Sequence, residues 1–227
     1  MSEQGSVTLV GGGKGGVGKS LLAMAVIDHR RAQGLPVVLV EAETTNSDVY
    51  LTYAPLLGAD AVHSIDLAQG AGGWHAVGDV VEQHPTAHIV VNTPAGLATT
   101  YERFGRQVAT LGALTGRFTT LWPINRLRDS LQLLARYMDA VPDARVAVVR
   151  NLFFGEPHRF RRFERSPFRA KHPDLMVGDL PELDDDLVDI VDERVPLEEV
   201  GARTTAMRRL TMEQWRRDTH AMLDALL

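Results

Sequence analysis

Short runs of apolar residues alternate along the chain with longer stretches in which apolar residues recur at helical spacing. The short runs predict β-strands at residues 7–10, 36–40, 88–91, 117–122, 144–149 and 175–177. The longer stretches predict amphipathic helices at residues 20–33, 76–84, 100–113, 126–140, 184–193 and 204–226. Gly34 follows the first helix and fits the left-handed position that often ends a helix. We interpret the glycine-rich residues 70–73 as a loop.

The predicted strands are apolar almost throughout, which is typical of a parallel sheet covered by helices on both faces. With 227 residues, the chain is long enough for one domain with a sizeable core. We therefore expect an α/β fold, a single domain over residues 1–227 with a doubly wound, mostly parallel sheet. Ligands of such sheets bind beyond the carboxyl ends of the strands.

A glycine-rich segment, GGGKGGVGKS, follows the first predicted strand at residues 11–20. Its last eight residues fit the pattern G-x-x-x-x-G-K-[ST], in which backbone N–H groups wrap a phosphate. Glycine suits this loop because a Cβ atom would collide with the ligand or forbid the backbone conformation. In this pattern Lys19 contacts the β- and γ-phosphates and Ser20 ligates Mg²⁺. The start of the following helix adds the positive end of its dipole.

The same segment also satisfies G-x-G-x-x-G, a dinucleotide-binding pattern, through Gly11, Gly13 and Gly16. That alternative leaves the lysine and the serine without a role. The phosphate-binding loop accounts for both residues and has the strand–loop–helix context that it requires, so it is the preferred interpretation.

Two lysines five positions apart distinguish the loop further. KGGVGKS, residues 14–20, resembles the deviant Walker A motif of the ParA/MinD family of ATPases. The resemblance implies a P-loop NTPase domain that binds ATP or ADP with Mg²⁺ and forms a homodimer on binding ATP. It implies that Lys14 reaches the nucleotide of the partner subunit, while Lys19 is the ordinary P-loop lysine. The nucleotide-binding residues that it implies are Gly13, Lys14, Gly15, Gly16, Val17, Gly18, Lys19, Ser20, Leu21 and Asn151.

Glu41-Ala42-Glu43 follows the second predicted strand, where the family usually has D-x-D. The second acid of that pattern usually helps to place the attacking water, which gives Glu43 a catalytic role beside Lys14 and Lys19. Glutamate keeps the charge but moves the carboxylate, and a displacement of ~1 Å can lower a rate about 100-fold. Alternatively, both residues are ordinary acids at a strand end.

The chain also departs from the family's D-T-P-x-G segment, because it has Asn92-Thr93-Pro94-Ala95-Gly96. The amide oxygen of Asn92 can accept a hydrogen bond from a Mg²⁺-bound water but supplies no negative charge. We expect Mg²⁺ to be held by Ser20, Glu41 and, through water, Asn92. Nucleotide binding should survive with weak coupling to Mg²⁺ and with slow or absent hydrolysis. Compensation for the lost charge by Glu41 is an alternative that the sequence leaves open.

Asn151 follows the strand predicted at residues 144–149. In the family an asparagine at this place often contacts the edge of adenine, and its amide offers both a donor and an acceptor. Asparagine is also a common turn residue, so a purely structural role is the alternative.

A basic segment, HRFRRFERSPFRAKH, occupies residues 158–172 within an excursion near 156–173. Basic residues interleaved with aromatic ones suit phosphate contact and stacking. The segment could therefore touch DNA or an acidic partner protein through Arg159, Arg161, Arg162, Arg165, Arg169 and Lys171. Alternatively, its phenylalanines pack into the fold and its arginines pair with the acidic residues between 179 and 193.

Composition narrows the functional classes. The chain has no cysteine, which excludes disulfides, thiolate zinc sites and the branch of the superfamily that carries an iron–sulfur cluster. Its net charge of −5 disfavours a globally basic nucleic-acid binder. No secretory signal or membrane span is visible, so we expect a cytoplasmic location.

The last predicted helix is amphipathic, and some family members carry a membrane-targeting helix at this end. Its apolar side should hold Met207, Leu210, Trp215, Met222 and Leu226. Acidic residues partly offset its arginines, so we favour a helix packed on the sheet.

These features together predict an ATP-binding dimeric switch of the ParA/MinD type, with weak ATPase activity. Plasmid partition, conjugal transfer and cargo positioning are all compatible with it. The first alternative is a nucleotide-binding scaffold that recruits a partner without useful turnover. The second is a kinase or phosphorylating ligase, for which no acceptor motif is visible.

Overall fold

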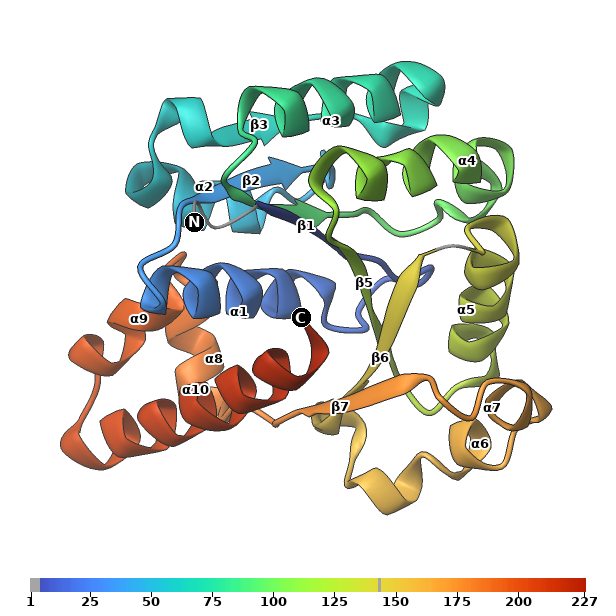
Figure 1. Cartoon of the computed structure of the whole chain (residues 1–227). Helices are drawn as coiled ribbons and strands as arrows, with labels where there is room; N and C mark the ends of the chain where they lie inside the picture. The colour runs from blue at the N-terminus through green and yellow to red at the C-terminus, as the bar shows by residue number, and fades with distance from the viewer. Residues whose placement is uncertain (1–4, 143) are drawn as a thin grey trace.

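The computed structural model describes residues 5–142 and 144–227. These residues form one α/β domain around a seven-stranded sheet in the order β3-β2-β4-β1-β5-β6-β7 (Figure 1). Every strand pair is parallel. The strands are β1 (Ser6–Val10), β2 (Val37–Glu41), β3 (Val62–Ser64), β4 (His88–Asn92), β5 (Phe118–Ile124), β6 (Arg145–Asn151) and β7 (Met176–Leu180). The domain predicted over residues 1–227 also includes residues 1–4 and 143, which lie outside the described part of the chain.

Six of these strands confirm the runs predicted from apolar patterning, with ends that differ by a few residues. The strand β3 was not predicted, because its three residues, Val-His-Ser, are too few to form an apolar run. It pairs with β2 at the edge of the sheet.

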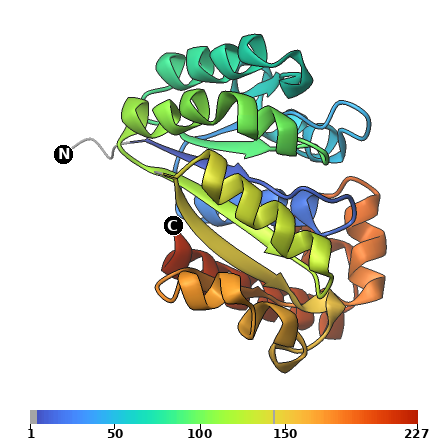
Figure 2. The same cartoon turned by 90° about the vertical axis from the view of Figure 1, so that its right-hand side faces the viewer.

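Helices cover both faces of the sheet. One face packs against α1 (Lys19–Ala32), α2 (Asp48–Leu57), α8 (Asp185–Asp192), α9 (Leu197–Val200) and α10 (Ala206–Leu226). The other packs against α3 (Ala71–Gln83), α4 (Ala98–Thr115), α5 (Arg128–Ala140) and the short helices α6 (Arg161–Glu164) and α7 (Pro167–Lys171). Figure 2 shows the green α4 and the yellow-green α5 in front of the sheet. Neighbouring strand residues alternate between the two cores, as Leu9 and Val10 do.

Three differences from the predicted helices have physical causes. The helix α2 includes Pro55 and was not predicted, and α6, α7 and α9 are each only one turn or little more. The helix α3 begins at Ala71, inside the segment that we interpreted as a loop. A Cβ atom on Gly73 would lie 2.6 Å from the carbonyl oxygen of Asp66, so this glycine allows close packing rather than a turn. Gly34 has a φ of 73° just after α1, as predicted for a helix end.

The C-terminal helix packs on the body of the domain, as predicted. Its buried residues are Met212, Trp215, Thr219, Leu223 and Leu226. The expectation that Met207 and Leu210 share this buried side was wrong, since they are 74% and 56% exposed. The close contact with β7 is made by the other half of α10, where Met222 and Leu226 lie against Gly178. Among the described residues, no helix has both the length and the apolar character that crossing a membrane requires.

Candidate functional site

The glycine-rich loop joins β1 to α1 at the carboxyl edge of the sheet (Figure 1). β1 is a central strand that pairs with β4 on one side and β5 on the other, so the loop lies where a doubly wound sheet binds ligands. Gly12, Gly16 and Gly18 have φ values of 151°, 70° and 94°. Residues that carry a side chain rarely adopt these φ values, which explains why glycine occupies the three positions.

In the described part of the chain, no side chain caps the first turn of α1. Gly18 occupies the N-cap position and contributes no capping side chain, and the first turn contains no acidic residue. The first N–H groups of a helix have no partner within the helix, and the helix dipole makes this end positive. This end of α1 is therefore suited to bind an anion.

Lys19, the first residue of α1, adds a largely buried positive charge. Its side chain is 8% exposed, and its Nζ donates a hydrogen bond to the carbonyl oxygen of Lys14 at 3.2 Å. Burial lowers the pKa of Lys19, and the negative charge of Glu43 opposes that effect. A buried ammonium group with so little compensation favours an anion beside it.

Lys14, the second lysine of the loop, is bound within the chain. Its Nζ lies 3.1 Å from Oδ2 of Asp129, a residue in the first turn of α5. Sequence reasoning did not select Asp129, because it lies 115 positions away and belongs to no motif. Both side chains are partly exposed, at 38% and 63%, so the pair contributes little to stability.

Glu41 and Asn92 form a buried pair at the ends of β2 and β4. Nδ2 of Asn92 donates to Oε1 of Glu41 at 2.9 Å, and the backbone N–H groups of Glu43 and Tyr50 donate to the same carboxylate. Burial raises the pKa of Glu41 to about 7 in spite of these hydrogen bonds. Oδ1 of Asn92 is buried and has no hydrogen-bond partner among the described residues, so it can accept a bond from a ligand or a water.

Glu43 lies in the turn that follows β2. Its Oε1 accepts a hydrogen bond from the backbone N–H of Thr45 at 3.0 Å. Its negative charge acts to raise the pKa of Lys19, although no ion pair within 4 Å joins the two residues in the described chain. The predicted role of Glu43 in placing water stays a prediction.

Asn151 contacts the loop directly. Its Nδ2 donates to the carbonyl oxygen of Val17 at 3.1 Å, and its Oδ1 accepts from the backbone N–H of Phe153. A Cβ atom on Gly18 would lie 2.4 Å from Nδ2 of Asn151, so the loop and the end of β6 fit closely. The amide keeps a second N–H, and contact with a nucleotide base stays a prediction.

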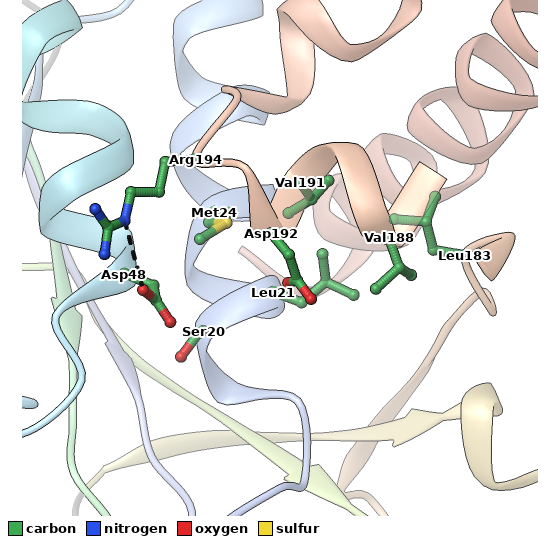
Figure 3. Close-up of a pocket in the computed structure, with 9 residues that line it drawn as sticks. All are labelled: Ser20, Leu21, Met24, Asp48, Leu183, Val188, Val191, Asp192 and Arg194. Carbon is green, nitrogen blue, oxygen red and sulfur yellow. Dashed lines mark ion pairs between the residues drawn. The ribbon is translucent and has the colours of Figure 1, made fainter. Parts of the chain in front are cut away.

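A pocket of about 220 Å³ adjoins Ser20 between α1, α2 and α8 (Figure 3). Its walls are apolar, and Asp48, Asp192 and Arg194 are its charged lining residues. Arg194 has a φ of 64°, a value that is uncommon for residues other than glycine, and its Nε lies 3.9 Å from Asp48. The apolar wall residues are Leu21, Met24, Leu183, Val188 and Val191. Apart from Leu21, sequence reasoning did not connect these residues with the loop, because they meet only in the folded chain.

The basic segment is anchored by its aromatic residues. Phe160 and Phe163 are buried in the core beneath α5. Arg169 donates to the carbonyl oxygens of His172 and Leu175 and lies over the ring of Phe163, so its role is structural. The other predicted contact residues, Arg159, Arg161, Arg162, Arg165 and Lys171, are exposed.

The acidic residues between 179 and 193 do not neutralise these exposed cations within the described chain. Asp179 pairs with Arg150, and Asp186 pairs with Arg208. In residues 5–142 and 144–227, no group of three or more histidine, aspartate or glutamate side chains could hold a metal ion by itself.

No family model matches the chain. Protein MobD from Acidithiobacillus ferrooxidans is 32% identical over 226 residues, which cover 98% of this chain and 98% of that protein.

Several solved structures have the same fold. The MinD cell division protein of Aquifex aeolicus has a TM-score of 0.59 and 17% identity, covering 96% of this chain and 97% of its own. An ATP complex of a Cyanothece McdA variant has a TM-score of 0.60 and 11% identity, and the match covers 98% of this chain and 97% of the McdA chain. A nucleotide-binding protein of Archaeoglobus fulgidus in complex with ADP has a TM-score of 0.51 and 15% identity, and the match covers 83% of this chain and 86% of that protein's chain. These likenesses confirm the predicted fold class.

Proposed function

The chain belongs to the family of Protein MobD, and from that premise we propose that it binds ATP at the glycine-rich loop and acts as a nucleotide-dependent dimeric switch. Proteins of the same fold have been solved with ATP and with ADP. Partition, conjugal transfer and cargo positioning are all compatible with such a switch.

One observation carries the proposal: a buried ammonium group lies at an uncapped helix start. Lys19 is 8% exposed with one carbonyl as its hydrogen-bond acceptor in the described structure, and Gly18 leaves the first turn of α1 without a side-chain cap. A phosphate would accept hydrogen bonds from both the lysine and the backbone N–H groups. Burial then strengthens this attraction, because water screens it less.

The residues at the ends of β2 and β4 fit a hydrated Mg²⁺ that arrives with the nucleotide. Ser20, Glu41 and, through water, Asn92 would hold it, and its chemistry there would be to neutralise phosphate charge. The unpartnered Oδ1 of Asn92 supports an acceptor role toward a bound water. Asn92 contributes no charge, so we expect slow hydrolysis.

The dimeric part of the proposal rests on Lys14. In the single chain this lysine pairs with Asp129 at 3.1 Å, and exposed pairs of this kind are worth at most about 1 kcal/mol. Lys14 can therefore leave Asp129 at little cost and reach a phosphate in a second subunit. ATP would then favour the dimer because it supplies the phosphates that both lysines bind.

The second candidate is a nucleotide-binding scaffold without useful turnover. The pairing of Asn92 with Glu41 favours it, because one hydrogen of the amide already engages the buried carboxylate. Turnover that requires ATP and disappears in Lys19→Ala would count against this scaffold.

Nucleotide binding is tested by titrating the protein with ATP and Mg²⁺ in a calorimeter. Lys19→Ala should weaken binding about 10- to 100-fold, because hydrogen bonds to charged groups contribute about 1.5–3 kcal/mol. Lys171→Ala removes an exposed lysine elsewhere and is the matched control. An equal dissociation constant for both variants, or no binding by the wild type, would refute the proposed site.

A further inference from the structure

A groove of about 560 Å³ runs between α5 and the two short helices α6 and α7. Figure 1 shows α6 and α7 beside one end of α5. The apolar lining of the groove comes from Leu131 and Ala135 on α5 and from Pro167 and Phe168 on α7. Leu131 is two positions from Leu133, whose side chain lies close to Gly13 of the loop.

Three arginines also line this groove: Arg128, Arg162 and Arg165. All three are exposed, and within the described chain no carboxylate lies within 4 Å of their guanidinium groups. Other arginines differ, since Arg150 pairs with Asp179 and Arg216 pairs with Asp28. The groove therefore combines an apolar floor with positive charge that the chain leaves unpaired.

The position of Arg128 does not serve the helix that carries it. Arg128 is the first residue of α5, where a positive charge opposes the helix dipole. Arg162 belongs to α6, a helix of four residues, and Arg165 follows it directly. A role in binding therefore accounts for the position of Arg128 better than a role in the local stability of α5 does.

We propose that this groove binds an acidic amphipathic segment of a partner protein. Carboxylates of the segment would pair with the guanidinium groups, which can form bidentate hydrogen bonds with a carboxylate. Apolar side chains on its other face would cover Leu131, Ala135 and Phe168. The inference goes beyond the proposed function, because it names a partner class and stands whether or not the loop binds nucleotide.

Nucleic acid fits the groove less well. Two of the three phenylalanines of the basic segment, Phe160 and Phe163, are buried in the core at 0% and 2% exposure and cannot stack on bases, and the third, Phe168, is half-buried. The apolar floor offers a phosphate backbone no partner, and the net charge of −5 repels it at long range. An acidic peptide with apolar anchors satisfies both the floor and the arginines.

The test selects binders from a phage-displayed library of random 16-residue peptides on immobilised protein that comprises residues 1–227. The recovered peptides should be rich in aspartate and glutamate and should carry two or more large apolar residues. In fluorescence anisotropy with synthetic peptides, Arg128→Glu, Arg162→Glu and Arg165→Glu should each weaken binding at least 10-fold. Arg106→Glu reverses an exposed charge on α4 and should leave binding unchanged.

Each remaining outcome contradicts the proposal. Selected peptides that are not acidic, or that bind the three groove variants as tightly as Arg106→Glu, would overturn it. Preferential binding of a 20-base-pair DNA duplex that the three groove variants lose would assign the surface to nucleic acid instead. Circular dichroism of each variant checks that the exposed substitutions leave the fold intact.

Discussion

At the scale of single residues, the pairing of Asn92 with Glu41 decides how the site behaves without a cation. The amide donates to the carboxylate at 2.9 Å, so the two side chains attract each other in a fully buried place. An aspartate at the same position would instead bring two carboxylates together, and their repulsion would be relieved only by a bound cation or by protonation of one of them. The asparagine therefore stabilises the ends of β2 and β4 without a cation, and under the proposed function it lowers the demand of the site for Mg²⁺.

Asn92→Asp tests this account through stability. Without Mg²⁺ at pH 8, it should lower the free energy of unfolding by about 3 kcal/mol, because it leaves a buried charge uncompensated. In a domain of this size, each kcal/mol lowers Tm by about 2–4 °C. Mg²⁺ with ATP should restore more stability to this variant than to the wild type, as thermal unfolding would show. Asn92→Ala, which loses the donor but adds no charge, is the control and should be less destabilised at pH 8.

At the scale of elements, the packing of α1 against α10 depends on a buried ionic cluster. Asp28 of α1 is 1% exposed and accepts hydrogen bonds from Arg216 and His220 of α10. Burial by itself raises the pKa of Asp28, but the bonds from His220 and Arg216 outweigh it and hold the pKa below its usual value. Beside this pair, burial lowers the pKa of His29, while its hydrogen bond to Asp224 opposes the change.

These directions give the cluster a defined pH dependence. The contribution of Asp28 is complete above its unfolded pKa of about 4 and is lost as pH falls through its lower folded pKa. The lowered pKa of His29 makes the protein lose stability as pH falls below about 6.5, because the unfolded chain then binds more protons. Acid should therefore weaken the contact of α1 with α10 in two stages.

Asp28→Asn should remove the loss of stability that the wild type shows below about pH 4, which is the second of the two stages. At pH 7 we expect a loss of about 3 kcal/mol, because Arg216 loses its buried partner. Below about pH 4 the difference from the wild type should shrink, while the change near pH 6.5 should persist. Urea unfolding at a series of pH values measures this, with the exposed Asp79→Asn as a control that should change stability little. A constant difference between the two proteins from pH 7 to pH 2 would contradict the assignment.

At the scale of the whole molecule, apolar patterning was sufficient for the layers of the fold but not for its contacts. Six strands and the principal helices follow from periodicity, because each buries a continuous run or stripe. The loop follows from its motif, since only glycine accepts its backbone angles and one lysine and one serine complete it.

The contacts within the candidate site and between the elements depend on pairs of residues that are distant in sequence. Nothing local to Asp129 indicates that it holds Lys14, and nothing near Leu183 or Arg194 indicates that they share a pocket with Ser20. Met207 and Leu210 fit the helical period of α10, yet they lie beyond its contact with β7. Such contacts depend on how the helices and strands pack against one another, and the hydrophobic pattern of a single sequence does not indicate this packing.

The central claim is that ATP converts the protein from monomer to dimer through the two lysines of its loop. Analytical ultracentrifugation of the wild type and Lys14→Ala, with Mg²⁺ and ATP, ADP or no nucleotide, tests it most directly, with bound nucleotide measured in each sample. We predict that the wild type dimerises with ATP alone, while Lys14→Ala binds nucleotide and stays monomeric. A wild type that binds ATP without any change in its sedimentation coefficient would contradict the switch.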